Sequence, residues 1–286
     1  IIMKSILIIG NRLSCYNVVA NNPRYRIVKI YALKESLLDK YLNDNQINHI
    51  CFSIDEKENV IDALLKENYN ILISNGCPFI LPAGKLKSQG KILINTHPTY
   101  LPFLRGATPL NGVFYLGYDF IGATTHYISD GIDSGNIIYQ EKIDVTPDLD
   151  QGLIYFISFD LESIVFSKAL ELLEYNNFKY TGSKMELSKG SYFNRTKEMQ
   201  YIDFSKDSLE LCIKKLKSFS ISSQGCFCNI MGHKYQLFSG EIINNTYLVN
   251  KFSNSTIGTI VLKYDDSLII KAKDGLIKIS KYKLIE

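Results

Sequence analysis

The sequence predicts an α/β fold, with a Rossmann-like, mainly parallel sheet covered by helices and then a smaller domain of mixed or antiparallel β structure. In the first two thirds of the 286 residues, short runs rich in Ile and Val alternate with amphipathic segments, as in a parallel sheet with helices on both faces. From residue 191 the chain changes to short alternating runs separated by turn-forming residues, which is typical of antiparallel hairpins. Because 46% of the residues are hydrophobic, two cores can form. We therefore expect a large domain over residues 1–190 and a small one over residues 191–286.

The large domain is expected to contain several short strands rich in Ile or Val. They are Lys4–Ile9, Arg26–Tyr31, Asn70–Ser74, Lys91–Asn95, Ile121–Ile128 and Ile137–Ile143. Between them, Ser36–Asn43 and Glu56–Glu67 are predicted helices, and the second places its aliphatic residues on one stripe. A longer helix is predicted from Gly152 to about Asn176, where two asparagines end it.

A helix and several hairpins are expected in the small domain. Ser205 is predicted to cap the helix at its N-terminus. The inner face of that helix should carry Leu209, Cys212, Ile213 and Leu216. Turns are predicted at Met231-Gly232, Asn244-Asn245, Asp265-Asp266 and Asp274-Gly275.

The composition argues against a membrane protein and against a metal centre. No stretch offers ~18 uninterrupted apolar residues, so we expect a soluble, cytoplasmic protein with no membrane partner. Six cysteines are scattered without a regular frame, which suits reduced thiols. Cys226 and Cys228 have one residue between them, a closer spacing than zinc sites use. We expect them on one face of a strand.

Two polar side chains end a buried strand in the large domain. Asn95 and His97 follow the run Ile92-Leu93-Ile94 and lie two residues apart. In an extended chain such residues point the same way, so both can reach one small group. Pro98 then stops the strand. Alone, such an Asn-x-His pair is more often structural than catalytic.

An Asp- and Gly-rich loop supplies a carboxylate near this pair. The chain leaves the strand that contains His126, passes through Asp130-Gly131-Ile132-Asp133 and returns as another strand. The glycines allow unusual backbone angles. Asp133 is expected to meet the imidazole of His97, whereas His126 is expected to pack nearby or to support the reacting groups.

Taken together, three motifs resemble the formyltetrahydrofolate-dependent formyltransferase family. They are Asn95-x-His97-Pro98, Leu101-Pro102-x-x-Arg105-Gly106 and His126-x-x-x-Asp130-x-x-Asp133-x-Gly135. The resemblance covers roughly residues 4–176 and implies the formyltransferase fold, with Asn95, His97 and Asp133 as catalytic residues. It also implies N10-formyltetrahydrofolate as co-substrate and no metal. By the same resemblance, the pterin ring would be held by Phe79, Ile80, Leu81, Asp130, Gly131 and Ile132.

The reaction of that family needs these residue types. An amine attacks a formamide carbon, so an oxyanion develops and a proton must leave the nitrogen. Asn95 can donate a hydrogen bond to the oxyanion. His97 can take the proton or, if charged, help with the oxyanion, and the sequence leaves both roles open. Asp133 would orient His97 and raise its pKa.

Two segments near residue 200 are similar to sugar N-formyltransferases, which modify dTDP- or UDP-linked amino sugars for surface polysaccharide. They are Ser191-Tyr192-Phe193-Asn194-Arg195 and Ile202-Asp203-Phe204. The implied substrate is dTDP-4-amino-4,6-dideoxyglucose or the 3-amino isomer. Residues 175–286 carry 17 Lys and Arg against 10 Asp and Glu, which suits an anionic partner. The candidate substrate-binding residues, for the pyrophosphate and the base, are Asn11, Arg12, Arg105, Tyr192 and Arg195, with Phe193 as a second stacking candidate.

Other functions stay open at this point. A methionyl-tRNA formyltransferase belongs to the same family, although such enzymes look different around the Leu101-Pro102-x-x-Arg105-Gly106 loop and carry a larger, barrel-like basic tail. A hydrolase that releases formate would use the same three residues, and a non-catalytic nucleotide- or folate-binding protein would keep the sheet. We expect the sugar enzyme, with no nucleic-acid partner, as a homodimer that the 19 tyrosines and 15 phenylalanines help to form.

Overall fold

The computed structural model describes residues 3–87 and 90–285, so the first two residues of the chain lie outside it. The chain divides into two compact units, and each combines three stretches of sequence. The first unit comprises Ile1–Ala107, Phe120–Asp144 and Phe156–Tyr192. The second comprises Thr108–Asp119, Val145–Tyr155 and Phe193–Glu286. The division into residues 1–190 and 191–286 stays a prediction.

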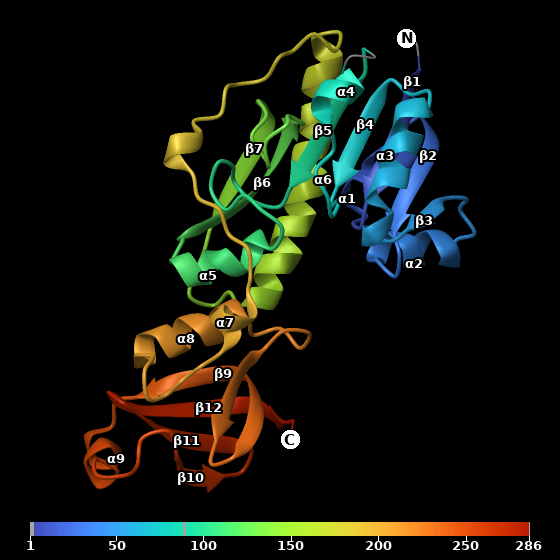
Figure 1. Cartoon of the computed structure of the whole chain (residues 1–286). Helices are drawn as coiled ribbons and strands as arrows, with labels where there is room; N and C mark the ends of the chain where they lie inside the picture. Colours follow the sequence, from blue (N-terminus) through green and yellow to red (C-terminus); the bar gives the residue numbers. More distant parts are fainter. Residues whose placement is uncertain (1–2, 88–89, 286) are drawn as a thin grey trace. The chain divides into compact units, whose positions relative to one another are not determined.

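A seven-stranded sheet forms the centre of the first unit, in the order β3-β2-β1-β4-β5-β6-β7 (Figure 1). The strands are β1 (Lys4–Gly10), β2 (Tyr25–Leu33), β3 (Ile50–Phe52), β4 (Ile71–Asn75), β5 (Ile92–His97), β6 (Phe120–Tyr127) and β7 (Ile137–Asp144). Neighbours from β3 to β5 pair in parallel, whereas β6 is antiparallel to both β5 and β7. The predicted mainly parallel α/β sheet is confirmed.

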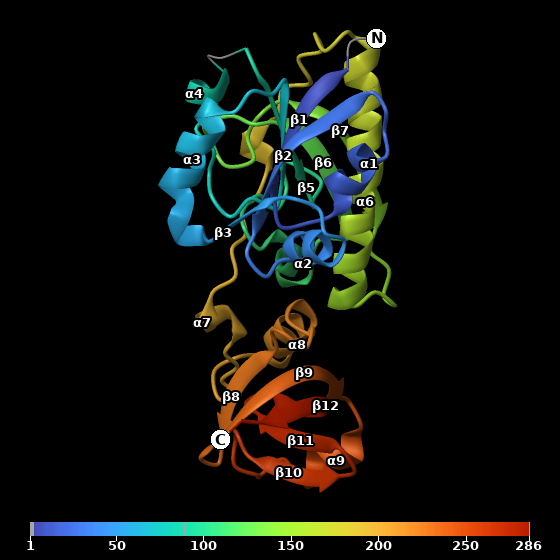
Figure 2. The ribbon, with the colours of Figure 1, turned by 90° about the vertical axis from the view of Figure 1, so that its right-hand side faces the viewer.

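Helices cover both faces of this sheet (Figure 2). Since successive side chains of a strand point to opposite faces, each strand packs against helices on both sides. Ile6 and Ile8 of β1 pack with residues of α1, α2 and α6, whereas Leu7 and Ile9 pack with residues of α3 and α4. The helical elements that contribute to this unit are α1 (Ser14–Ala20), α2 (Leu37–Asp44), η1 (Ile54–Glu56), α3 (Lys57–Lys66), α4 (Ala83–Lys87), α6 (Gln151–Tyr175, from Phe156 on) and η3 (Leu187–Lys189). Among the described residues, no helix has the length and apolar character to cross a membrane.

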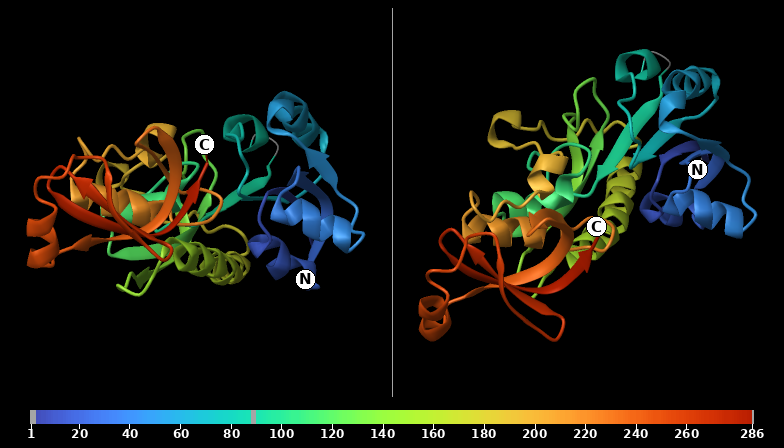
Figure 3. Two further views of the ribbon diagram at one scale, coloured as in Figure 1. Left: turned by 90° about the horizontal axis from the view of Figure 1, so that it is seen from below. Right: turned by 60° about the horizontal axis from the view of Figure 1, so that its bottom comes forward.

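The second unit contains an antiparallel five-stranded sheet, whose strands are orange to red in Figure 3. The strand order is β10-β11-β12-β9-β8. Its strands are β8 (Cys226–Ile230), β9 (His233–Ile243), β10 (Ile260–Tyr264), β11 (Ser267–Ala272) and β12 (Gly275–Leu284). Its further elements are η2 (Pro109–Asn111), α5 (Gly112–Leu116), α7 (Lys197–Gln200), α8 (Leu209–Ser218) and α9 (Thr246–Lys251). Leu209, Cys212 and Leu216 of α8 pack on the sheet, and Cys226 and Cys228 are buried in the same core.

Two local predictions for this unit are wrong. The serine that caps α8 is Ser208, whose hydroxyl accepts the N–H of Leu211 at 3.2 Å. The hydroxyl of Ser205 instead donates to Asp203, so this serine is used in the preceding turn. Asn245 does not close a hairpin but caps α9, since asparagine suits both roles.

Candidate active site

The carboxyl ends of three parallel strands meet at one edge of the sheet in the first unit. The order of strands along the chain reverses between β1 and β4, and crevices beside such a reversal commonly hold ligands. Gly10 at the end of β1 lies opposite Asn75 of β4, and Ser74 lies opposite Asn95 of β5. The end of β5 therefore brings Asn95 and His97 to this edge.

The amide of Asn95 is oriented by a neighbouring histidine. The carbonyl oxygen of Tyr127 lies 2.9 Å from Nδ1 of His126 and can only accept, so Nδ1 carries the proton. In the neutral form of the ring, Nε2 of His126 is then an acceptor, and it lies 3.1 Å from Nδ2 of Asn95. The same amide nitrogen lies 3.4 Å from Oδ1 of Asp133. The N–H groups of Asn95 thus point between His126 and Asp133.

The imidazole of His97 is buried, with 5% of the residue exposed, between a backbone carbonyl and a carboxylate. Nε2 lies 3.0 Å from the carbonyl oxygen of Leu104, and Nδ1 lies 3.6 Å from Oδ2 of Asp133. The carbonyl can only accept, so Nε2 of His97 carries a proton. Nδ1 is therefore the ring nitrogen that can exchange a proton within the site.

Asp133 contacts each of the groups predicted to act with it. Oδ2 accepts the N–H of Gly106 at 3.1 Å and faces His97, while Oδ1 faces Asn95 and lies 3.7 Å from Nε2 of His126. The residue adopts a left-handed backbone with φ of 44°, which aspartate tolerates better than most residues. The structure thus brings all three predicted catalytic side chains together.

Burial and charge oppose each other at this cluster. Burial lowers the pKa of His97 below its ordinary value, and the Asp133 carboxylate and the Leu104 carbonyl only partly offset it. Burial raises the pKa of Asp133, but His97 and His126 outweigh it, so the pKa of Asp133 falls well below its usual range. At neutral pH the pair is a carboxylate beside a neutral imidazole whose Nδ1 can accept a proton.

Arg12 is held by a buried carboxylate. Its Nε and Nη2 lie 3.0 and 2.8 Å from the two carboxylate oxygens of Glu162 in α6, and its guanidinium lies 5.1 Å from the Phe159 ring centroid. Glu162 is fully buried; burial raises its pKa and Arg12 only partly opposes this shift. The predicted contact of Arg12 with a pyrophosphate stays a prediction, but part of its guanidinium is already engaged.

The side chain of Asn11 packs over a glycine. Gly76 has φ of 77°, and a methyl group placed on it would lie 1.9 Å from Oδ1 of Asn11 and 3.0 Å from Nη1 of Arg12. Oδ1 of Asn11 is buried and has no hydrogen-bond partner among the residues that the structure describes. Position 76 therefore requires glycine.

The two segments predicted to hold the folate approach each other. The segment 79–81 follows β4 and precedes α4, with Leu81 buried and Ile80 exposed. Oδ1 of Asp130 accepts the N–H of Gly84 in α4 at 3.1 Å. Ile132 is 41% exposed in the same loop. The contact of these residues with a folate stays a prediction.

The remaining predicted substrate residues lie in different units. The N–H of Arg105 donates to the Ser191 carbonyl at 3.0 Å, and Tyr192 is 51% exposed beside it in the first unit. Arg195 belongs to the second unit, where its N–H donates to the Thr108 hydroxyl at 2.6 Å. Within the described residues, Nε of Arg105 and Nη1 of Arg195 are buried without a hydrogen-bond partner.

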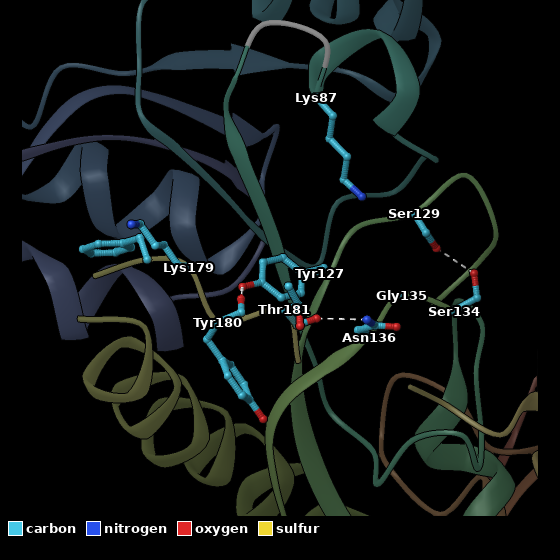
Figure 4. Close-up of a pocket in the computed structure, with 10 residues that line it drawn as sticks. Lys87, Tyr127, Ser129, Ser134, Gly135, Asn136, Lys179, Tyr180 and Thr181 are labelled. Atoms are coloured by element: carbon cyan, nitrogen blue, oxygen red, sulfur yellow. Dashed lines mark hydrogen bonds between the residues drawn. The ribbon is translucent and has the colours of Figure 1, made fainter. Parts of the chain in front are cut away.

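A separate cavity of about 470 Å³ lies against the loop that carries Asp133 (Figure 4). It is lined by Lys87, Tyr127, Ser129, Ser134, Gly135, Asn136, Phe178, Lys179, Tyr180 and Thr181. The hydroxyls of Ser129 and Ser134 lie 2.8 Å apart and close the ends of the loop on each other. None of the three predicted catalytic side chains lines this cavity.

Sequence reasoning gave Leu104 and Glu162 no role at the site. The carbonyl of Leu104 has no sequence signal, because any residue carries one. Glu162 is one of several charged residues in α6, so its type alone did not distinguish it or identify its partner. Within residues 3–87 and 90–285, no group of three His, Cys, Asp or Glu side chains is placed to hold a metal ion.

Family models match most of the chain. Residues 17–170 match the model of the formyl transferase family, and residues 194–286 match the model of the formyl transferase C-terminal domain. A methionyl-tRNA formyltransferase from Caldanaerobacter subterraneus is 26% identical over 230 residues, which cover 79% of this chain and 70% of the relative.

Solved structures share the fold of the chain. A 4-N formyltransferase from Francisella tularensis gives a TM-score of 0.67 at 24% identity, covering 82% of this chain and 96% of that one. An N-formyltransferase from Helicobacter canadensis, solved with folinic acid and dTDP-3-aminofucose, gives 0.66 at 19% identity and covers 98% and 100%. HypX from Aquifex aeolicus also matches, with a TM-score of 0.65 at 14% identity over 98% of this chain, which spans 46% of that longer protein.

Proposed function

The chain belongs to the formyl transferase family, and on that premise we propose that it transfers the formyl group of N10-formyltetrahydrofolate to an amino group of a nucleotide-linked amino sugar. The observation that carries the reaction class is the convergence of Asn95, His97 and Asp133 on one point at the sheet edge. An amide donor, a ring nitrogen able to accept a proton and a carboxylate are the groups that acyl transfer to an amine requires.

The contacts of the site suggest how each group acts. As the amine nitrogen bonds to the formyl carbon, the formyl oxygen becomes an oxyanion and Asn95 donates an N–H to it, a contribution of ~3 kcal/mol. Nδ1 of His97 accepts the proton that the amine loses, because Nε2 already donates to Leu104. Asp133 then faces an imidazolium across 3.6 Å. The bond from the formyl carbon to N10 breaks, and His97 returns the proton to the departing tetrahydrofolate.

These contacts favour the base role for His97 over the role of a permanent cation. A neutral ring with its proton on Nε2 leaves a lone pair on Nδ1, and burial keeps the ring neutral. The nearby carboxylate stabilises the charge that appears on His97 during the reaction, so the ring gains basicity when it is needed.

The nucleotide sugar is proposed from the segment that follows residue 190. Ser191 and Tyr192, which belong to the motif similar to sugar N-formyltransferases, lie against the loop that contains Leu104 and Arg105. The Helicobacter canadensis enzyme, which shares the fold, was solved with dTDP-3-aminofucose. We favour dTDP-4-amino-4,6-dideoxyglucose or its 3-amino isomer, made for surface polysaccharide such as lipopolysaccharide O-antigen. A cytoplasmic homodimer with no nucleic-acid partner belongs to the same proposal.

A second candidate is methionyl-tRNA formyltransferase. It is favoured by the curated relatives, which include one that is 27% identical over 88% of this chain. The same three catalytic groups would serve that reaction, since it is also formyl transfer to a primary amine. The two candidates differ only in the acceptor.

A panel of acceptors tests the proposal. The protein is incubated with N10-formyltetrahydrofolate and, in separate reactions, dTDP- and UDP-linked 3- and 4-amino sugars and charged initiator tRNA. Mass spectrometry should find one added formyl group on a nucleotide sugar, and none in a matched reaction with the His97→Ala variant. Formylation of the tRNA alone would exclude the sugar. Formate release without any formylated acceptor would indicate a hydrolase.

A further inference from the structure

Leu104, the residue whose carbonyl contacts His97, has an unusual backbone. Its φ is 56°, a left-handed conformation that costs an L-residue other than glycine roughly 1–2 kcal/mol. Such a conformation persists only where surrounding contacts hold it. Leu104 is 2% exposed, so the polar groups of its backbone must find partners within the protein.

Those partners come from two sides. The Leu104 N–H donates to the hydroxyl of Ser191 at 2.8 Å, and the N–H of Arg105 donates to the Ser191 carbonyl at 3.0 Å. On the other side, the Leu104 carbonyl accepts from Nε2 of His97 at 3.0 Å and from the hydroxyl of Thr99 at 3.2 Å. The hydroxyl of Ser191 therefore holds the peptide group before Leu104. Its backbone carbonyl holds the peptide group after Leu104, which carries the carbonyl that His97 contacts.

The neutral ring of His97 has one proton and two acceptors that compete for it. Leu104 offers a carbonyl at hydrogen-bonding distance from Nε2, whereas Asp133 offers a carboxylate 3.6 Å from Nδ1. A carboxylate is the stronger acceptor at equal distance. If the Leu104 carbonyl turned away, the proton would move to Nδ1, and the lone pair would move to Nε2, away from Asp133.

We propose that Ser191 is a positioning residue that, by fixing the Leu104 carbonyl, selects the tautomer of His97 in which Nδ1 is the base. This rests on the proposed function of the same site. The charged and titratable groups that face His97 are Asp133 from the β6–β7 loop, His126 from β6 and Arg12 from the end of β1. Ser191→Ala removes the hydroxyl bond to the Leu104 N–H. It keeps the backbone bond from the Arg105 N–H to the carbonyl of residue 191, and it leaves these three side chains in place.

The direct readout is the tautomer, which needs no substrate. The chain has four histidines, so a protein labelled with ¹⁵N in its imidazoles gives few signals. His97 is assigned by the loss of its signals in a His97→Gln variant. In the unaltered protein Nε2 of His97 should have the shift of a protonated nitrogen and Nδ1 that of a lone-pair nitrogen. In Ser191→Ala the two shifts should exchange in a major part of the population, while those of His126, whose Nδ1 donates to Tyr127, should not.

Kinetics give a second readout. A general base contributes ~10² to 10⁴ in rate, so partial loss of the correct tautomer should lower kcat about tenfold in Ser191→Ala, with KM for both substrates within about twofold. The acidic limb of the rate profile should move to lower pH, because the charged ring loses an acceptor. Ser191→Thr keeps a hydroxyl and should restore the rate. Ser188→Ala, an exposed serine in η3, is the matched control.

The two readouts separate this proposal from the proposed function. Unchanged ¹⁵N shifts in a folded Ser191→Ala protein, checked by its thermal midpoint, would overturn the role of Ser191 whatever the acceptor is. If Ser191→Ala unfolds, the same shifts are recorded for Ser191→Thr and Ser191→Cys, and a normal tautomer in Ser191→Cys, which offers only a weak acceptor, refutes the role. If the ¹⁵N shifts exchange in Ser191→Ala but the unaltered protein formylates no acceptor, the positioning role of Ser191 is supported and the proposed function is contradicted.

Discussion

Replacing Asp133 by asparagine removes the charge that the proposed mechanism needs and changes little else. The two side chains have the same shape, and asparagine tolerates the left-handed backbone at this position, where φ is 44°. The acceptor for the Gly106 N–H can be kept by the amide oxygen. The amide nitrogen would then take the position of Oδ1, where it faces Nδ2 of Asn95 and Nε2 of His126. The main change at His97 is therefore the loss of the negative charge beside Nδ1.

The expected loss follows from the distance between the two groups. Opposite unit charges separated by 3.6 Å interact by about 4 to 5 kcal/mol at an effective dielectric constant of ~20. This stabilisation exists only after His97 has accepted the proton, so its loss falls on the transition state. With about 1.4 kcal/mol for each factor of ten, kcat of Asp133→Asn should fall by roughly 10³.

The assay follows tetrahydrofolate release with a formylatable acceptor at saturating concentrations of both substrates. Asp62→Asn, an exposed carboxylate of α3, is the control for loss of one negative charge. The pKa of Asp133 lies well below its usual range, so the acidic limb of the unaltered protein reports His97. That limb should move to lower pH in the variant, because the charge that raises the pKa of His97 is gone. A kcat within threefold of the unaltered protein would refute the role given to Asp133.

Three further changes test the framework around the site. Arg12→Met leaves the buried Glu162 without its ion pair and should lower the free energy of unfolding by about 3–5 kcal/mol. The double variant Arg12→Met, Glu162→Met should recover part of the lost stability. A change in KM without loss of stability would show that the pair is not structural. Gly76→Ala should lower the thermal midpoint by an amount equivalent to about 1–3 kcal/mol, since φ is 77°, and a stability equal to that of the unaltered protein would contradict the geometry. Ser208→Ala should lower the free energy of unfolding in urea by about 1 kcal/mol, whereas Ser205→Ala should lower it by less. A larger loss in Ser205→Ala would support Ser205 as the cap, as the sequence predicted.

The sequence predicted the central strands well because each is a buried run of aliphatic residues. The strand expected at Asn70–Ser74, for example, is Ile71–Asn75 in the structure. The strand Ile50–Phe52 was not predicted, because three residues at the edge of a sheet give almost no periodic signal. The helix Ser14–Ala20 was also not predicted, since most of its residues are buried and it has no charged stripe.

Polar residues in turns were harder to interpret than apolar residues in strands. Ser205 and Ser208 both precede the same helix, and either can cap it. The choice depends on Asp203, which takes the hydroxyl of Ser205. Asn245 likewise suits a turn or a cap, and only the residues after it decide. Local sequence therefore gave the right residue types at these ends, but it gave the wrong serine as the cap of α8 and the wrong role for Asn245.

The candidate site shows the same limit at longer range. Asn95 and His97 could be found because their spacing on a strand is a local property, and Asp133 because the family motif includes it. The partner of Arg12 is 150 residues away, and no local pattern links two such positions. Arg12 was therefore predicted to bind the pyrophosphate of a substrate, although in the structure part of its guanidinium is engaged by the buried carboxylate of Glu162.

The ring nitrogen of His97 that is protonated depends on backbone groups, which the residue types in a sequence do not reveal. His97 has two possible acceptors, and the nearer one is the backbone carbonyl of Leu104, a group that every residue possesses. The carbonyl points at the ring because Leu104 is held in a left-handed conformation by Ser191, 87 residues away in the chain. In the proposed mechanism, the motif of Asn, His and Asp therefore specifies which groups react, whereas the fold determines which nitrogen of His97 acts as the base.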